Sequence, residues 1–194
     1  FSLVLYYSSF VFRGLRWKIL TLNAGLNHLQ NTTEPTLISF SQIVLMGWFV
    51  NAVAWLRLGD PYRAYAFSER SGAAFPWSLG TILAERVLDM ITVFGLLVIG
   101  VAWFSITQDS EGVGRVLLAA FIMALILATT LWVMKTHGAR LSHLLPKRIE
   151  SSYHRFEAGT VTSLKRLPIL SILGIIGWIL ETGRLYFVTK SLDI

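Results

Sequence analysis

Long apolar runs separated by short basic segments constrain this chain more than any other feature of its sequence. A membrane-spanning helix needs about 20 mostly apolar residues, and several runs approach that length. The apolar runs are 1–12, 37–56, 90–106, 116–134 and 167–188. Charged residues make up only 14% of the chain, against about a quarter in an ordinary soluble domain. The sequence therefore predicts an all-α fold, a polytopic transmembrane helix bundle.

Both ends of the chain lie close to apolar runs. Phe1 already stands inside the first run, and the chain stops two residues after Leu192, just past the last one. We therefore expect residues 1–194 to form a single transmembrane domain that is partial, with both ends cut from a longer protein.

The distribution of charge predicts an orientation in the cell membrane. Cytoplasmic loops of membrane proteins are enriched in Lys and Arg, so we expect the segments 13–18, 57–70 and 135–166 to be cytoplasmic. The segment 107–114 carries acidic residues and no basic one, and we expect it to be external. The net charge of +6 is then explained by anionic lipid headgroups and not by a nucleic-acid-binding face.

This orientation requires the chain to enter and leave the membrane on the same side before Arg57. Either Ile19–Gln30 crosses as a weakly apolar helix, or Leu37–Leu56 is a re-entrant segment. Gly47 and Asn51 interrupt the apolar run as they would in a broken helix. Non-helical backbone at membrane depth is tolerated where it is buried in protein or lines a wet cavity. We favour the re-entrant interpretation.

Several classes of site have no counterpart in the sequence. The chain contains no cysteine, which excludes disulfides and thiolate ligands, and its 4 histidines form no metal-binding spacing. Nucleophile elbows, phosphate loops and dinucleotide fingerprints are also missing. We therefore expect no metal, no cofactor and no catalytic residues here, and whether the whole protein is an enzyme stays open.

A first group of polar residues follows the second apolar run. Arg57 and Arg63 stand on either side of a Gly59-Asp60-Pro61 turn. A planar guanidinium can donate two hydrogen bonds to one phosphate, and Asp60 would hold one arginine in place between substrate visits. This spacing predicts a phosphate-headgroup site. The alternative interpretation is a basic cytoplasmic loop.

A second group lies where the third apolar run begins. Glu85 and Asp89 share one helix face, next to Arg86. Two carboxylates on one face repel each other unless a cation lies between them, and Arg57 or Arg63 is the expected cation. The group predicts an ion-pair network that shapes a polar cavity, or a proton relay. A solvated helix start at the membrane interface is the alternative.

A third group lies inside the last apolar run. Glu181 and Arg184 are spaced to form an i, i+3 pair one turn after Trp178. Such a pair lowers the cost of charge at membrane depth, where ionisable residues are often functional. The pair is either a substrate contact or purely structural.

Taken in order, these residues resemble the lysylphosphatidylglycerol synthase transmembrane-region family, also called flippase-like integral membrane proteins. The family pattern is Asn, then Pro-x-Arg-x-Gly-Glu/Asp-x-x-Arg-Ala, then Glu-Arg-x-x-Asp, with a later Trp-x-x-Glu-x-x-Arg helix. The matching residues are Arg16, Trp17, Asn51, Arg57, Gly59, Asp60, Arg63, Ala64, Glu85, Arg86, Asp89, Trp178, Glu181 and Arg184. Trp55 stands where the family usually has proline, so we expect a different bend at the re-entrant turn.

The resemblance implies a membrane domain of about eight helices, of which this chain would hold the middle. It also implies binding and translocation of an anionic phospholipid or a polyprenyl-phosphate-linked substrate. Arg57, Asp60, Arg63 and Gly59 would contact the headgroup, while Glu85, Arg86, Asp89, Glu181 and Arg184 would line or brace a polar path. The alternatives are the membrane half of an aminoacyl-phosphatidylglycerol synthase and a structural subunit of a larger membrane complex. The expected partners are anionic membrane lipids, with homo-oligomerisation left open.

Overall fold

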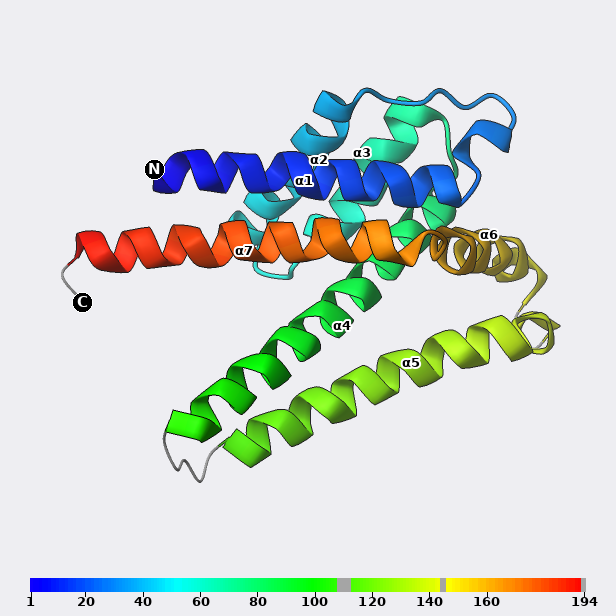
Figure 1. Cartoon of the computed structure of the whole chain (residues 1–194). Coiled ribbons are helices and arrows are strands. Elements are labelled where there is room, and N and C mark those ends of the chain that lie inside the picture. The colour runs from blue at the N-terminus through cyan, green and yellow to red at the C-terminus, as the bar shows by residue number, and fades with distance from the viewer. Residues whose placement is uncertain (108–112, 144–145, 193–194) are drawn as a thin grey trace.

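The computed structural model describes residues 1–107, 113–143 and 146–192, and these residues form an assembly of helices (Figure 1). The elements are α1 (Ser2–Asn23), a 3₁₀ turn η1 (Leu26–His28), α2 (Leu37–Val53), α3 (Gly59–Ser71), α4 (Phe75–Thr107), α5 (Val113–His143), α6 (Lys147–Ser163) and α7 (Leu167–Ser191). The described residues contain no strand, which confirms the predicted all-α class.

The apolar surface of the helices lies outside and charged residues lie inside. Ile172, Ile179, Leu125 and Trp132 are each more than half exposed, while other apolar side chains and several charged ones are buried. Among the described helices, α7 meets the length and composition of a membrane span, with a mean hydropathy of 1.4. Shorter apolar stretches occupy α2 and part of α5. This arrangement is typical of a helical protein whose surroundings are lipid.

Helix α1 is longer than the sequence pattern predicts. We expected the first span to end at the cytoplasmic charges 13–18, but α1 continues unbroken to Asn23 and lies alongside α7 (Figure 1). Arg13 and Arg16 are buried within the helix bundle, while Lys18 forms a surface ion pair with Glu34 at 2.8 Å. The first two arginines are therefore interior residues and not part of a loop, because other helices surround them.

Helices α2 and α3 form a hairpin whose two outer ends meet. The backbone N–H of Thr33, just before α2, donates to the carbonyl of Ser71 at the end of α3, at 2.9 Å. The chain therefore enters and leaves this hairpin at one end, as the re-entrant interpretation expects. The hairpin extends over 37–71, however, so the segment 57–70 contains the end of its connecting loop and nearly all of its return helix α3, and is not a loop beyond it. The segment Ile19–Gln30 does not form the separate helix that the alternative interpretation requires, because these residues finish α1 and form a short turn.

Glycine lets the two helices of the hairpin approach closely. Gly47 lies inside a continuous α2 and does not break it, contrary to our expectation. A Cβ at Gly47 would lie 2.5 Å from Cγ of Arg63, and one at Gly59 would lie 2.2 Å from the carbonyl oxygen of Gly47. Any larger residue at either position would separate α2 from α3.

The rest of the chain forms two further packed pairs. Helices α4 and α5 run back along each other from the segment 107–114, whose residues 108–112 lie outside the described ones (Figure 1). The basic segment 135–166 is helical over most of its length, as the end of α5 and as α6. Helix α6 crosses α4 where Gly80 and Gly159 allow the backbones to touch.

The crossing of α4 and α6 yields a stability prediction. A Cβ at Gly80 would lie 2.2 Å from the carbonyl oxygen of Phe156, which is backbone and cannot move aside. Gly80→Ala should therefore lower the free energy of unfolding by about 1–3 kcal/mol through overpacking. The measurement is the unfolding midpoint of the detergent-solubilised protein.

Gly100→Ala in the same helix is the matched control, because a Cβ at Gly100 meets nothing within 4 Å. It should leave stability unchanged or raise it by up to about 1 kcal/mol, as Ala favours helix over Gly. Equal midpoints for the two variants would show that the crossing is looser than described.

Candidate functional site

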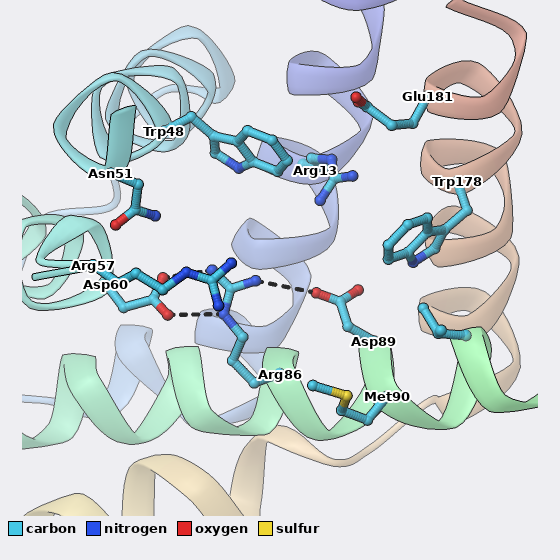
Figure 2. Close-up of a pocket in the computed structure, with 11 residues that line it drawn as sticks. Arg13, Trp48, Asn51, Arg57, Asp60, Arg86, Asp89, Met90, Trp178 and Glu181 are labelled. Carbon is cyan, nitrogen blue, oxygen red and sulfur yellow. Dashed lines mark hydrogen bonds and ion pairs between the residues drawn. The ribbon is translucent and has the colours of Figure 1, made fainter. Parts of the chain in front are cut away.

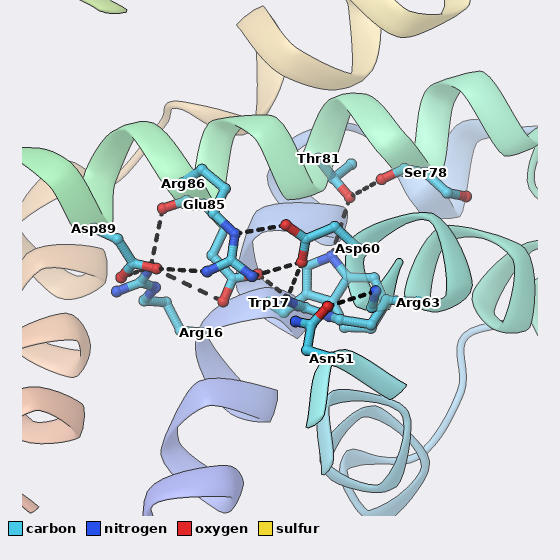
Figure 3. Close-up of polar contacts among 11 residues, drawn as sticks. Arg16, Trp17, Asn51, Asp60, Arg63, Ser78, Thr81, Glu85, Arg86 and Asp89 are labelled. Carbon is cyan, nitrogen blue, oxygen red and sulfur yellow. Dashed lines mark hydrogen bonds and ion pairs between the residues drawn. The ribbon is translucent and has the colours of Figure 1, made fainter. Parts of the chain in front are cut away.

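Six charged side chains from three helices form a closed ring in which arginines and carboxylates alternate (Figure 3). In order around this charge ring, the members are Arg63, Glu85, Arg16, Asp89, Arg86 and Asp60, which returns to Arg63. The successive N···O distances are 2.6, 4.0, 2.6, 3.5, 2.5 and 3.7 Å. Three positive and three negative groups make the ring formally neutral, which reduces the cost of charge in the interior.

One half of the charge ring is buried. The side chains of Arg63 and Glu85 are only 2% and 3% exposed, and that of Arg16 is 4% exposed. The guanidinium of Arg63 also lies 4.5 Å from the ring centroid of Trp17, whose indole N–H donates to the Thr81 hydroxyl at 3.1 Å. These contacts join α1, α3 and α4 around the buried half.

The other half of the charge ring is accessible. Arg86 donates two hydrogen bonds to Asp60, from Nε to Oδ2 at 2.8 Å and from Nη2 to Oδ1 at 2.5 Å. These two side chains are 32% and 31% exposed, and that of Asp89 is 10% exposed. Such fork-shaped pairing is strong for an ion pair, but partial exposure to solvent weakens it.

Local sequence explains why α3 presents Asp60 to α4. The carbonyl oxygen of the Asn51 side chain accepts from the Gly59 N–H at 2.7 Å and so satisfies one unpaired donor at the helix start. Asp60 lies in the first turn, where a negative charge is favourable, and Pro61 is tolerated there because that turn needs no N–H donor. The predicted Gly59-Asp60-Pro61 turn is therefore the first turn of a helix.

A cavity of about 480 Å³ lies beside the accessible half of the charge ring (Figure 2). Residues from α1, α2, α3, α4 and α7 and from the loop before α3 line it. They are Arg13, Trp48, Asn51, Arg57, Asp60, Arg86, Asp89, Met90, Val93, Trp178 and Glu181. The cavity wall therefore combines charged groups with aromatic and aliphatic side chains.

Arg13 is the most unusual residue of the cavity wall. It is 9% exposed, and its guanidinium lies between the rings of Trp48 and Trp178, 4.9 and 5.8 Å from their centroids (Figure 2). Within the described part of the chain, Arg13 forms no ion pair, and its Nε has no hydrogen-bond partner. The indole N–H of Trp178 is also buried without a partner there. Two hydrogen-bond donors of the cavity wall are thus unsatisfied.

The carboxylates of the cavity wall, by contrast, already have partners. Asp60 is paired with Arg86, Asp89 with Arg16 at 2.6 Å, and Glu181 with Arg184 at 2.5 Å. Arg57 is exposed on the loop between α2 and α3 and, like Arg13, has no ion pair among the described residues. Arg13 and Arg57 are therefore the two arginines of the wall without a carboxylate at ion-pair distance among the described residues, and the more distant Asp89, Glu85 and Glu181 act electrostatically on Arg13.

The structure places some of the sequence-predicted residues in the cavity wall and the others outside it. Arg57, Asp60, Arg86, Asp89 and Glu181 line the cavity. Arg63, Gly59, Glu85 and Arg184 do not line it. Arg63 and Glu85 form the buried half of the charge ring, Gly59 packs against α2, and Arg184 lies 5.0 Å from the ring centroid of Tyr6.

Sequence reasoning missed two arginines of α1. We expected Arg57 or Arg63 to be the cation between Glu85 and Asp89. Arg63 does contact Glu85, but Arg16 is the cation that contacts both carboxylates, and Arg57 contacts neither. The available signal was the presence of two arginines one turn apart, Arg13 and Arg16, just before Trp17 in one helix.

The buried half of the charge ring makes a second stability prediction. Arg63→Met leaves the buried Glu85 with Arg16, at 4.0 Å, as its remaining ion-pair partner. The free energy of unfolding should therefore fall by about 3–5 kcal/mol. The double variant Arg63→Met/Glu85→Leu removes both charges and should recover most of that loss. Unfolding midpoints in detergent measure both effects.

Arg70→Met is the control, because Arg70 is exposed at the end of the same helix and should change stability by less than about 0.5 kcal/mol. If the double variant were as unstable as Arg63→Met, the loss of stability would come from packing around Arg63 and not from the unpaired charge of Glu85.

Comparison with known proteins identifies the family. The family model described as lysylphosphatidylglycerol synthase TM region matches residues 1–194. The UPF0104 membrane protein MJ1078 of Methanocaldococcus jannaschii is 28% identical over 148 residues, which cover 75% of this chain and 62% of the archaeal protein. The match thus spans less than two thirds of that relative. No solved structure matches the chain. Because the family model covers the whole sequence, this membrane protein belongs to the lysylphosphatidylglycerol synthase transmembrane-region family.

Proposed function

We propose that the cavity binds the phosphate headgroup of an anionic lipid, and that the protein translocates this lipid across the cell membrane. One observation carries the proposal. Arg13 and Arg57 face the cavity without an ion pair in the described residues, whereas each carboxylate of the wall is already paired with an arginine. A buried, unpaired cation is costly, and an anionic ligand would offset that cost.

The donors at Arg13 suit a phosphate. The guanidinium fork and the Trp178 indole N–H supply hydrogen bonds within one small region, and a phosphate has several acceptor oxygens. The rings of Trp48 and Trp178 stabilise the guanidinium by cation–π contact when no ligand is bound. The site is therefore preorganised, because Arg13 does not have to break an ion pair to meet a headgroup.

The remaining wall suits the rest of a lipid molecule. Met90 and Val93 of α4 extend the lining with aliphatic surface next to the charged groups. Phospholipids and polyprenyl phosphates share a phosphate next to a hydrocarbon chain, so the cavity chemistry accommodates either. The paired charges of α4 and α7 would brace the polar path, as the family resemblance implies.

The arrangement of helix ends supports an orientation in the membrane. Asn23 at the end of α1 donates to the carbonyl of Lys165 at 2.7 Å, and Thr33 meets Ser71 at the open end of the hairpin. The basic residues Lys18, Arg70, Lys165 and Arg166 lie at or near these same helix ends. We infer that this end faces the cytoplasm.

Binding to anionic lipid should depend on Arg13. Arg13→Gln should weaken binding of the full-length protein to phosphatidylglycerol by roughly tenfold or more, the effect of losing a charge-assisted contact. Trp178→Phe keeps the ring but removes the N–H, and should weaken binding by a smaller factor. The measurement is a titration with phosphatidylglycerol in phosphatidylcholine nanodiscs.

Arg70→Gln is the matched control, since Arg70 is an exposed arginine outside the cavity wall. It should leave the titration unchanged. If Arg70→Gln and Arg13→Gln lowered the affinity for phosphatidylglycerol equally, the effect would come from the general surface charge and not from the cavity. An unchanged affinity in a folded Arg13→Gln protein would remove the cavity as the headgroup site.

Translocation should depend on Arg57. In reconstituted vesicles, Arg57→Gln should slow the transbilayer movement of a fluorescent phosphatidylglycerol several-fold, because Arg57 is the exposed cation of the cavity wall. Arg70→Gln serves again as the control. A protein that binds the lipid through Arg13 but shows no translocation above protein-free vesicles would contradict the transport half of the proposal.

A further inference from the structure

A second cavity shares part of its wall with the first. This groove of about 240 Å³ lies between α4 and α6, and is lined by Asp60, Leu79, Ile82, Leu83, Arg86 and Phe156. Asp60 and Arg86 also line the larger cavity. Apart from this pair, the groove is lined by aliphatic and aromatic side chains. The Asp60–Arg86 ion pair is therefore a partition between a charged cavity and an apolar groove.

The partition is the part of the charge ring that a ligand in the larger cavity can reach. Arg86 and Asp60 are the ring's most exposed side chains. Each carboxylate that Arg86 contacts has a second arginine nearby. Asp60 lies 3.7 Å from Arg63, and Asp89 lies 2.6 Å from Arg16. Moving Arg86 away therefore leaves neither carboxylate without a cation.

An anionic headgroup can replace the carboxylate partner that Arg86 would lose on leaving Asp60. A phosphate in the larger cavity carries negative charge and several acceptor oxygens, so it can replace Asp60 as the partner of Arg86. The exchange keeps Arg86 paired, and Asp60 turns to Arg63. An uncharged or zwitterionic headgroup offers less net negative charge for this exchange.

We propose that Arg86 is a switchable headgroup contact. An anionic headgroup takes Arg86 from Asp60, the partition opens, and the groove between α4 and α6 receives a hydrocarbon chain of the same lipid. The lipid then lies across both cavities, with its phosphate against the arginines and its chain against Leu79, Leu83 and Phe156. This inference rests on the proposed function and adds a residue and a second binding surface to it.

The decisive experiment uses the competition between Asp60 and the ligand. Asp60→Asn removes the competing charge and nearly keeps the shape of the side chain. It should tighten phosphatidylglycerol binding about two- to fivefold in the nanodisc titration, which corresponds to the free energy of a partly exposed ion pair. Arg86→Gln should weaken binding, and Asp60→Asn should then give no gain in the Arg86→Gln background. Tighter binding that survives in the double variant, or weaker binding in Asp60→Asn, would overturn the switch.

A second measurement tests the groove directly. The chain contains no cysteine, so Leu83→Cys places a thiol in the groove at a site unique within these residues. Phosphatidylglycerol, but not phosphatidylcholine alone, should slow labelling of this thiol several-fold, because the hydrocarbon chain covers it. Arg86→Gln in the same background should abolish that protection. Labelling that phosphatidylglycerol does not change would overturn the groove as the chain site.

The two experiments separate failure of the switch from failure of the proposed function. If the function holds and the switch fails, Arg13→Gln still weakens binding while Asp60→Asn gives no Arg86-dependent gain. If the function fails, neither the unmodified protein nor Asp60→Asn prefers phosphatidylglycerol to phosphatidylcholine, and the inference fails with it. Unfolding midpoints of all variants show which of them retain the fold.

Discussion

The charge ring is the constraint on which the rest of the structure depends. Charges inside a helix bundle that faces lipid are costly, and each of the six groups of the ring has two neighbours of opposite sign. Arg16 of α1, the Asp60 and Arg63 pair of α3, and Glu85 through Asp89 of α4 satisfy one another only when these three helices hold one relative position. The ring therefore determines the position of the α2–α3 hairpin. The cavity depends on that position, because residues of the hairpin form part of its wall.

Small residues make this geometry accessible. Arg63 reaches Glu85 because α3 lies close to α2, and that approach requires the paired positions Gly47 and Gly59 to lack side chains. Gly174 of α7 likewise leaves space for the guanidinium of Arg16, since a Cβ there would lie 2.6 Å from its Nη1. Where glycine has no such neighbour, as at Gly100, it plays no comparable part. Tight packing and charge pairing thus depend on each other in this fold.

The sequence predicted the class of fold better than the partners within it. Apolar runs predicted an all-α membrane protein, and the spacing of Glu85 and Asp89 predicted that a cation would lie between them. The identity of that cation was beyond local reasoning, because Arg16 contacts Asp89 across 73 residues. The positive-inside rule assigned Arg13 and Arg16 to a cytoplasmic end, since charges next to an apolar run usually lie at the interface. That rule fails when distant helices bring carboxylates and aromatic rings to meet the arginines.

The charge ring is formally neutral. The cationic groups that we propose as the headgroup site, Arg13 and Arg57, therefore lie outside the ring. Within the described residues, the carboxylates of the cavity wall are already paired with other arginines, so Arg13 and Arg57 have hydrogen-bond donors that no ion pair occupies. The neutral charge ring, together with the arginines beside it that form no ion pair, suits a site that binds an anionic headgroup and releases it.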